Sequence, residues 1–232
     1  MTTTPSRTPA TDVTPAGTGT ARLLAAVAVT LAPVLFAVAN LLIPYDTNGS
    51  SKEIARDIAA HQGVTELAAW LWTVGTVLFL PGIVAVGLLA TARSPRLGLW
   101  GAALFGTGLV AIGTTPSLDT VALGAYAKGV RQEDVVRMAD GVNGLPVVGG
   151  PILYFVVAHV VGAILLGVAL LRGRAIPAWA AWLLILSMPI NAAAYLTGLA
   201  PLTAASFLML AIGCGYAGLT FTRHGTGWTR TA

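Results

Sequence analysis

The chain has 232 residues, of which 56% are hydrophobic and only 9% are charged. Soluble domains carry about 25% charged residues, so this chain has too few charges to keep a globule of its size in water. The composition excludes a disordered protein, a disulfide-stabilised secreted scaffold and a conventional soluble enzyme. The net charge is +4, but the 13 lysines and arginines lie in ones and twos between apolar blocks, which argues against a nucleic-acid partner.

Residues 1–22 are rich in threonine, proline, alanine and glycine, and we predict a disordered cytoplasmic tail there. Six apolar blocks without lysine, arginine, aspartate or glutamate follow, and about 20 helical residues suffice to cross a bilayer. The sequence therefore predicts an all-α, polytopic membrane protein with a six-helix transmembrane domain over residues 23–221 and a cytoplasmic tail over residues 222–232. The predicted spans are residues 23–43, 67–92, 97–118, 151–171, 176–196 and 202–221.

The first block has an alternative interpretation as a signal peptide. Arg22 precedes it, and Ala37-Val38-Ala39 resembles a small-residue cleavage site. The block is longer than the roughly 7–15 apolar residues of a signal peptide, which favours a retained helix.

The charges between the spans predict the orientation. If the amino terminus is cytoplasmic, the inner segments carry eight arginines and one acid, whereas the outer segments carry five basic residues and eight acids. Cytoplasmic loops of membrane proteins are enriched in arginine and lysine. We therefore expect both termini to be cytoplasmic, with the bilayer as the principal partner.

The outer connections carry two short helical patterns. Ser50-Ser51-Lys52-Glu53 fits a capping box ahead of an amphipathic helix with Ile54 and Ile58 on one face, and Glu133–Asp140 has a similar pattern. We expect both helices to lie on the outer rim of the bundle. The simplest explanation of their role is that they only cover the ends of the long helices.

Small residues at four-residue spacing predict where the apolar helices pack, because they allow two backbones to approach closely. The rows are Gly98, Ala102 and Gly106 in the third span, Ala163 and Gly167 in the fourth, and Ala211 and Gly215 in the sixth. Pro151 follows Gly149-Gly150 and is expected in the first turn of the fourth span.

No nucleotide-binding, hydrolase or metalloprotease motif occurs in the chain. The three histidines are dispersed, and the single cysteine, Cys214, lies in an apolar block, where we expect it to be a packing residue. We therefore expect no metal site and no cofactor.

Polar side chains concentrate in the outer half of the predicted spans. Counting 1.5 Å per residue from the inner arginines places Asn40, Asn191 and Ser206 at about 26–27 Å and His159 at about 20 Å. Polar groups in a membrane usually face the bundle interior or a water-filled cavity. We interpret this layer as an outward-facing polar vestibule that binds a ligand through Asn40, His159, Ser187, Asn191, Tyr195 and Ser206; the alternative is hydrogen bonding between helices.

Three functional classes are consistent with this layer. The first is a membrane protein that binds a lipophilic or small ligand, or a membrane protein partner, from the outer side. The second is a small transporter that forms a homo-oligomer. The third is an intramembrane enzyme for a lipophilic substrate, with Glu66, Asp119 and His159 as candidate catalytic acids and bases.

Residues 58–89 and the stretches PRLGLWGAALFGTG and AIPAWAAWLLIL share a distinctive hydropathy and Pro/Gly pattern. In this pattern the chain resembles a group of uncharacterised six-helix integral membrane proteins of high-GC Gram-positive bacteria. The resemblance covers about residues 21–222 and implies a six-helix fold in the plasma membrane. It implies no catalytic residue and no substrate.

The predicted topology can be tested by labelling. A cysteine that replaces Asn48 should react with an impermeant thiol reagent added to intact cells, and a reporter fused after Ala232 should be active in the cytoplasm. Labelling of a cysteine at Arg93 or Arg96 from outside would contradict the assignment.

Overall fold

The computed structural model describes residues 18–226, which form nine α-helices and, within that range, no strand. It confirms the all-helical fold. The long helices are α1 (Thr18–Leu42), α3 (Gln62–Thr91), α4 (Pro95–Gly113), α7 (Pro146–Arg172), α8 (Ala178–Thr197) and α9 (Ala200–His224). Six segments are long and apolar enough to span a membrane, and the third of them runs through α4 and the following α5.

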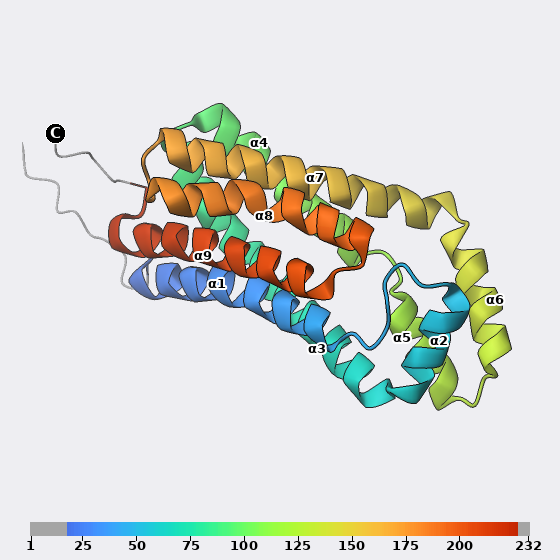
Figure 1. Cartoon of the computed structure of the whole chain (residues 1–232). Coiled ribbons are helices and arrows are strands. Elements are labelled where there is room, and N and C mark those ends of the chain that lie inside the picture. Colours follow the sequence, from blue (N-terminus) through green and yellow to red (C-terminus); the bar gives the residue numbers. More distant parts are fainter. Residues whose placement is uncertain (1–17, 227–232) are drawn as a thin grey trace, which may run out of the picture.

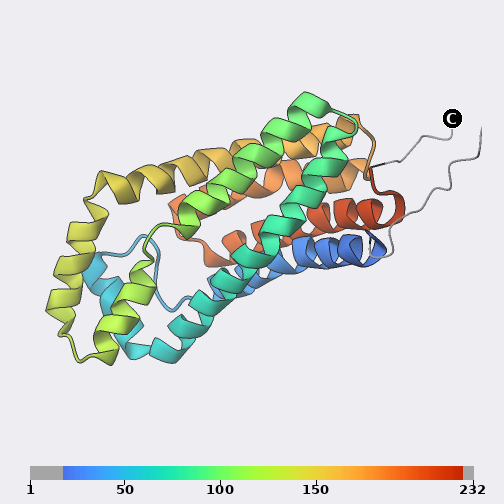
Figure 2. The ribbon, with the colours of Figure 1, turned by 180° about the vertical axis from the view of Figure 1, so that it is seen from behind.

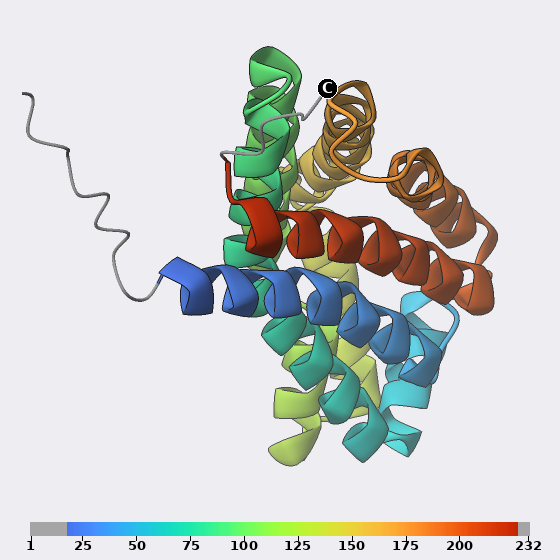
Figure 3. The same cartoon turned by 90° about the vertical axis from the view of Figure 1, so that its left-hand side faces the viewer.

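The six long helices form a closed ring in which each packs against two neighbours. The order around the ring is α1, α3, α4, α7, α8 and α9, and α9 packs back against α1 (Figure 3). Both described chain ends lie at one end of the ring, together with the α3–α4 and α7–α8 turns (Figure 1). No short turn joins α4 to α7 or α9 to α1, so packing alone holds these two pairs together.

Glycines bring α4 and α7 into close contact. A β-carbon at Gly162 would lie 2.7 Å from the backbone nitrogen of Phe105, and one at Gly101 would lie 2.8 Å from the backbone nitrogen of Leu166. No side chain fits in such gaps. Lipid tails give apolar helices no hydrophobic reason to associate, so contacts of this kind stabilise the ring.

The predicted packing row on α4 is only partly correct. Gly98 and Ala102 contact α3, but a β-carbon at Gly106 would come no nearer to another residue than 3.9 Å, at Ile83. The reason is that α3 and α4 diverge from their shared turn, which leaves an apolar groove beside Gly106. A second close face of α4 is that of Gly101, which contacts α7.

Two helix starts differ from the predicted spans. The first helix begins at Thr18, within the predicted tail; the rest of that tail, residues 1–17, and residues 227–232 of the carboxyl-terminal tail lie outside the described residues. The expectation for Pro151 was wrong, because α7 begins at Pro146 and Pro151 lies inside the helix. Pro146 occupies the first turn, where a missing N–H group costs nothing.

The three short helices form a small cap at the other end of the ring. They are α2 (Ser51–Ala60), α5 (Leu118–Ala127) and α6 (Gln132–Asn143), and Figure 2 shows them beside the extended ends of α3 and α7. Their shared apolar core consists of Ala55, Ile58, Ala122 and Val135. The sequence did not predict α5.

The predicted capping box at the start of α2 is confirmed. The Glu53 backbone N–H donates to Ser50 Oγ over 3.3 Å, and the Ser50 backbone N–H donates to Glu53 Oε2 over 2.9 Å. These bonds from Ser50 lower the pKa of the exposed Glu53 carboxyl.

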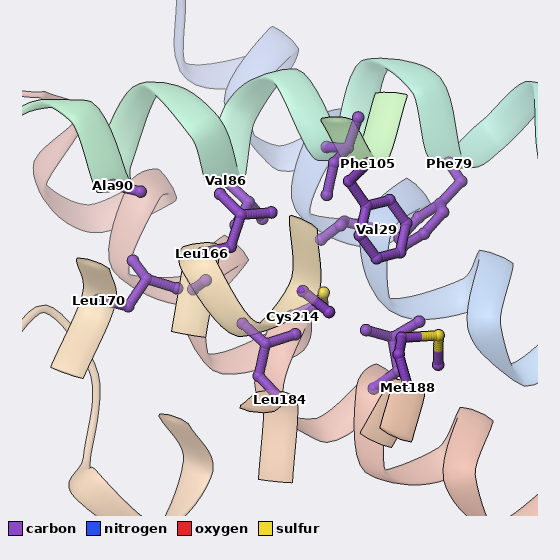
Figure 4. Packing of buried hydrophobic residues seen from close by; sticks show 14 of the residues in the cluster. Val29, Phe79, Val86, Ala90, Phe105, Leu166, Leu170, Leu184, Met188 and Cys214 are labelled. Atoms are coloured by element: carbon purple, nitrogen blue, oxygen red, sulfur yellow. The ribbon is translucent and has the colours of Figure 1, made fainter. Parts of the chain in front are cut away.

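The half of the ring away from the cap has an apolar interior. Val86, Leu166, Leu170 and Leu184 are fully buried there as members of one hydrophobic cluster, and Figure 4 shows their side chains pointing into the interior between the helices. Cys214 is buried in the same cluster, as expected for a packing residue.

The glycine contacts predict a clear difference between two alanine substitutions. Gly162→Ala should lower the free energy of unfolding by about 1–3 kcal/mol, because the added methyl group must push α4 away from α7. Gly106→Ala has room for the methyl group and should be neutral or slightly stabilising. Thermal unfolding of both variants in detergent measures the difference, and equal losses would contradict the assigned packing face.

Candidate functional site

All six helices of the ring contribute to one central cavity. It has a volume of about 30 Å³, which is room for one or two water-sized groups. Most of its wall is aromatic, and the rings belong to Phe36, Trp72, Phe79, Phe105, Phe155 and Phe207. Several of the rings contact one another; the centroids of Phe36 and Trp72 lie 4.5 Å apart, and those of Phe79 and Phe105 lie 5.4 Å apart.

His159 on α7 is the most unusual polar residue of the cavity wall. Its ring stacks on that of Phe155, with centroids 4.2 Å apart, and Nδ1 donates a hydrogen bond to the Phe155 carbonyl oxygen. The side chain is 4% exposed, and Nε2 is the one buried side-chain nitrogen or oxygen of residues 18–226 without a hydrogen-bond partner. An unpaired polar atom in such a place costs about 1–3 kcal/mol and needs an explanation.

Two hydrogen-bonded pairs surround the polar side of the cavity. Asn191 Nδ2 donates to Ser206 Oγ over 2.9 Å, which joins α8 to α9, and Tyr195 OH donates to Asn40 Oδ1 over 2.8 Å, which joins α8 to α1. With His159, the structure thus brings together five of the six predicted ligand-binding residues. Asn191 and Tyr195 line the cavity with His159, whereas Asn40 and Ser206 support them from behind.

The remaining candidates do not reach the cavity. Ser187 is fully buried and donates to the Leu184 carbonyl oxygen of its own helix. Glu66 is exposed on the first turns of α3, and Asp119 lies at the start of α5. Neither carboxylate lines the cavity with His159, so the three candidate catalytic residues do not form one site.

Asp119 instead takes part in a contact between the cap and the end of α1. Tyr45 OH donates to Asp119 Oδ1 over 2.6 Å, and both side chains are partly buried. Burial and the neighbouring carboxylate raise the pKa of the Tyr45 hydroxyl well above its ordinary value, so it remains a donor at physiological pH. Nearby, Asn48 Nδ2 donates to the Tyr195 carbonyl oxygen over 3.1 Å. This bond joins the segment between α1 and α2 to α8.

Sequence reasoning missed the aromatic wall of the cavity. Five of the six phenylalanines of the chain line it, although each looks like an ordinary apolar residue in its own block. The depth count that selected the polar layer could have found them. Phe36, Phe79 and Phe207 lie 14 to 16 residues from the arginines that end their helices, or about 21–24 Å, which is close to the depth of His159.

The chemistry of the cavity is that of a neutral, apolar site with a few polar groups. No charged side chain lines it, and residues 18–226 contain no group of three or more histidine, cysteine, aspartate or glutamate side chains that could hold a metal ion. Its polar side-chain groups are the imidazole of His159, the amide of Asn191, the phenol of Tyr195 and the indole of Trp72. Such a wall suits a small apolar molecule that carries one polar group.

The fold and its six apolar helices are compatible with a multi-pass membrane protein. Comparisons of the chain with protein-family models, with curated proteins and with solved structures found no match. The resemblance to six-helix proteins of high-GC Gram-positive bacteria therefore rests on the sequence pattern alone.

The contact between Tyr45 and Asp119 predicts a local effect on the cap. Tyr45→Phe should lower the stability of the cap by about 1.5–3 kcal/mol, because a partly buried carboxylate loses its donor. Hydrogen exchange of the backbone amides in α5 measures the loss and should become faster in the variant. Tyr154→Phe is the control, since it removes an exposed bond between Tyr154 OH and Thr107 Oγ1 and should leave α5 unchanged. Unchanged exchange in Tyr45→Phe would contradict the prediction.

Proposed function

We propose that this chain is a multi-pass membrane protein that binds a small, neutral, lipophilic molecule carrying a hydroxyl group in its central cavity. The observation that carries the proposal is the unpaired Nε2 of His159, which is buried in the wall of an aromatic cavity. A ligand that satisfies this atom would remove the cost of burying it.

The hydrogen bond of His159 to its own helix selects the ligand chemistry. A carbonyl oxygen accepts only, so Nδ1 carries the hydrogen in that bond. In the neutral imidazole the other nitrogen, Nε2, then has only a lone pair. The ligand must therefore donate a hydrogen bond to Nε2, as an alcohol or a phenol does, while its apolar body lies against the aromatic rings.

The closed form of the cavity is smaller than such a ligand. Binding requires the side chains of the wall to rotate, or the polar pairs on the cap side to separate and admit the ligand. Those pairs, Asn191–Ser206 and Tyr195–Asn40, contain the residues that the sequence predicts for an outward-facing polar vestibule. We propose that they form the closed state of that vestibule.

Binding is better supported than transport or catalysis. A transporter needs a second route from the cavity to the end of the ring away from the cap. That half of the ring is filled by the apolar interior around Leu166, Leu170 and Leu184. An enzyme needs an acid or base within reach of His159. Neither Glu66 nor Asp119 lies on the cavity wall.

A matched pair of probes tests the proposal. p-Cresol and p-xylene differ by a hydroxyl in place of a methyl group, so they share an apolar body. The purified protein should bind p-cresol about fivefold more tightly than p-xylene, which corresponds to one hydrogen bond of about 1 kcal/mol. The ¹⁵N resonance of His159 Nε2 should shift with p-cresol only, while that of His61 stays unchanged as the internal control.

The variant His159→Leu separates a binding role from a structural one. It should remain folded and should lose the preference for p-cresol, because the leucine side chain has no acceptor. If neither probe binds the wild-type protein, or if wild type and variant bind both probes equally, the proposed function is wrong.

A further inference from the structure

The two short turns opposite the cap lie in contact and form a basic corner of the molecule. Ser94 Oγ in the α3–α4 turn donates to the Ala169 carbonyl oxygen near the end of α7, over 3.5 Å. A β-carbon at Gly173 in the α7–α8 turn would lie 2.6 Å from the β-carbon of Arg93. Figure 1 shows the two turns side by side. The basic corner is defined here by Arg96, Arg172 and Arg174.

The three guanidinium groups of the basic corner are exposed and uncompensated. None of them makes an ion pair or a hydrogen bond with another described residue, whereas the ion pairs found in residues 18–226 all lie in the cap. Every aspartate and glutamate of that range lies at residues 46–66 or 119–140, at the cap end. Arginines brought together without acids form a site for an anion.

The backbone at Arg174 indicates that this arginine has a role of its own. Its φ angle is 50°, in the left-handed region, and it is the only non-glycine residue of the described chain with a positive φ. The Arg174 N–H donates to the Leu171 carbonyl oxygen and the Ala175 N–H donates to that of Leu170, which is the pattern of a glycine-type helix ending. An arginine is disfavoured there, and strain of this kind is concentrated at functional positions.

Exposed tryptophans border the basic corner on the side of the apolar helices. Trp100 is 62% exposed and lies one helical turn beyond Arg96 on α4, and Trp179 is 52% exposed and lies in the first turn of α8. Indole rings favour the boundary between hydrocarbon and water. In a bilayer, this arrangement would put the arginines at the level of the lipid headgroups, with an apolar surface directly beside them.

We propose that the basic corner binds the phosphodiester group of an anionic phospholipid. Guanidinium groups donate paired hydrogen bonds to phosphate oxygens, and basic pockets beside membrane-spanning helices bind acidic headgroups. The tryptophans favour a lipid over free phosphate, because the acyl chains can lie along the exposed apolar helices while the phosphate meets the arginines. This site is separate from the central cavity and does not depend on it.

Native mass spectrometry of the purified protein, titrated with phosphatidylglycerol or phosphatidylcholine, tests the proposal. Wild type should bind phosphatidylglycerol more tightly than phosphatidylcholine. The triple variant Arg96→Gln, Arg172→Gln, Arg174→Gln should lose this preference, because each arginine removed should weaken the affinity for phosphatidylglycerol about fivefold. The control variant Lys52→Gln, Arg56→Gln, Lys128→Gln removes three cap charges and should retain it. Equal binding of the two lipids by wild type, or an unchanged preference in the triple variant, would overturn the proposal.

Two further measurements keep the test decisive. Inorganic phosphate at matched ionic strength should not displace phosphatidylglycerol; full displacement would assign the site to free phosphate and overturn the lipid proposal. Arg174→Gly suits the left-handed backbone, so it should raise the melting temperature in neutral detergent while lowering the affinity for phosphatidylglycerol about fivefold. An unchanged affinity in this well-folded variant would exclude Arg174 from the site.

Discussion

The close approach of α4 and α7 at Gly101 and Gly162 closes the ring of helices. Between these helices the chain makes a long excursion through α5 and α6, so no short turn holds the pair together. Within a bilayer, apolar surface alone would not hold it either. Backbone contact at two glycines therefore decides whether the six helices enclose a common interior or open into a sheet-like layer, and every feature of the central cavity depends on that enclosure.

Enclosure explains the chemistry of the interior. Polar side chains that face inward have no lipid headgroups or bulk water to contact, so they must bind one another. Asn191 with Ser206 and Tyr195 with Asn40 do so across three helices. His159 instead donates from Nδ1 to the Phe155 carbonyl oxygen of its own helix, and its Nε2 has no hydrogen-bond partner. The unsatisfied nitrogen is thus a property of the whole ring and not of one helix.

Much of the fold could be predicted from the sequence, because the signals involved are local. Uncharged apolar blocks predict the long helices, and Ser50 with Glu53 predicts the start of α2. Helix ends were less predictable; Pro146 and Pro151 both fit a first turn, and only the structure distinguishes them. The helix α5 was missed because its sequence continues the apolar block before it with little amphipathic contrast.

The candidate site was predictable in its polar half only. Asn40, Asn191 and Ser206 are conspicuous because amides and hydroxyls are rare in apolar blocks, and their shared depth suggested a common layer. The phenylalanines have no such contrast. The bond between Tyr45 and Asp119 joins residues 74 positions apart, and nothing in either segment indicates its partner.

The two longest helices give the cap a mechanical connection to the cavity. At about 1.5 Å per residue, α3 and α7 are about 45 and 40 Å long, well beyond the roughly 30 Å of a hydrocarbon core. Each runs without a break from the cap to the cavity wall, where α3 contributes Trp72 and α7 contributes His159. The cap is therefore joined to these two side chains by continuous helix rather than by loops, and in α7 the connecting stretch contains Pro151.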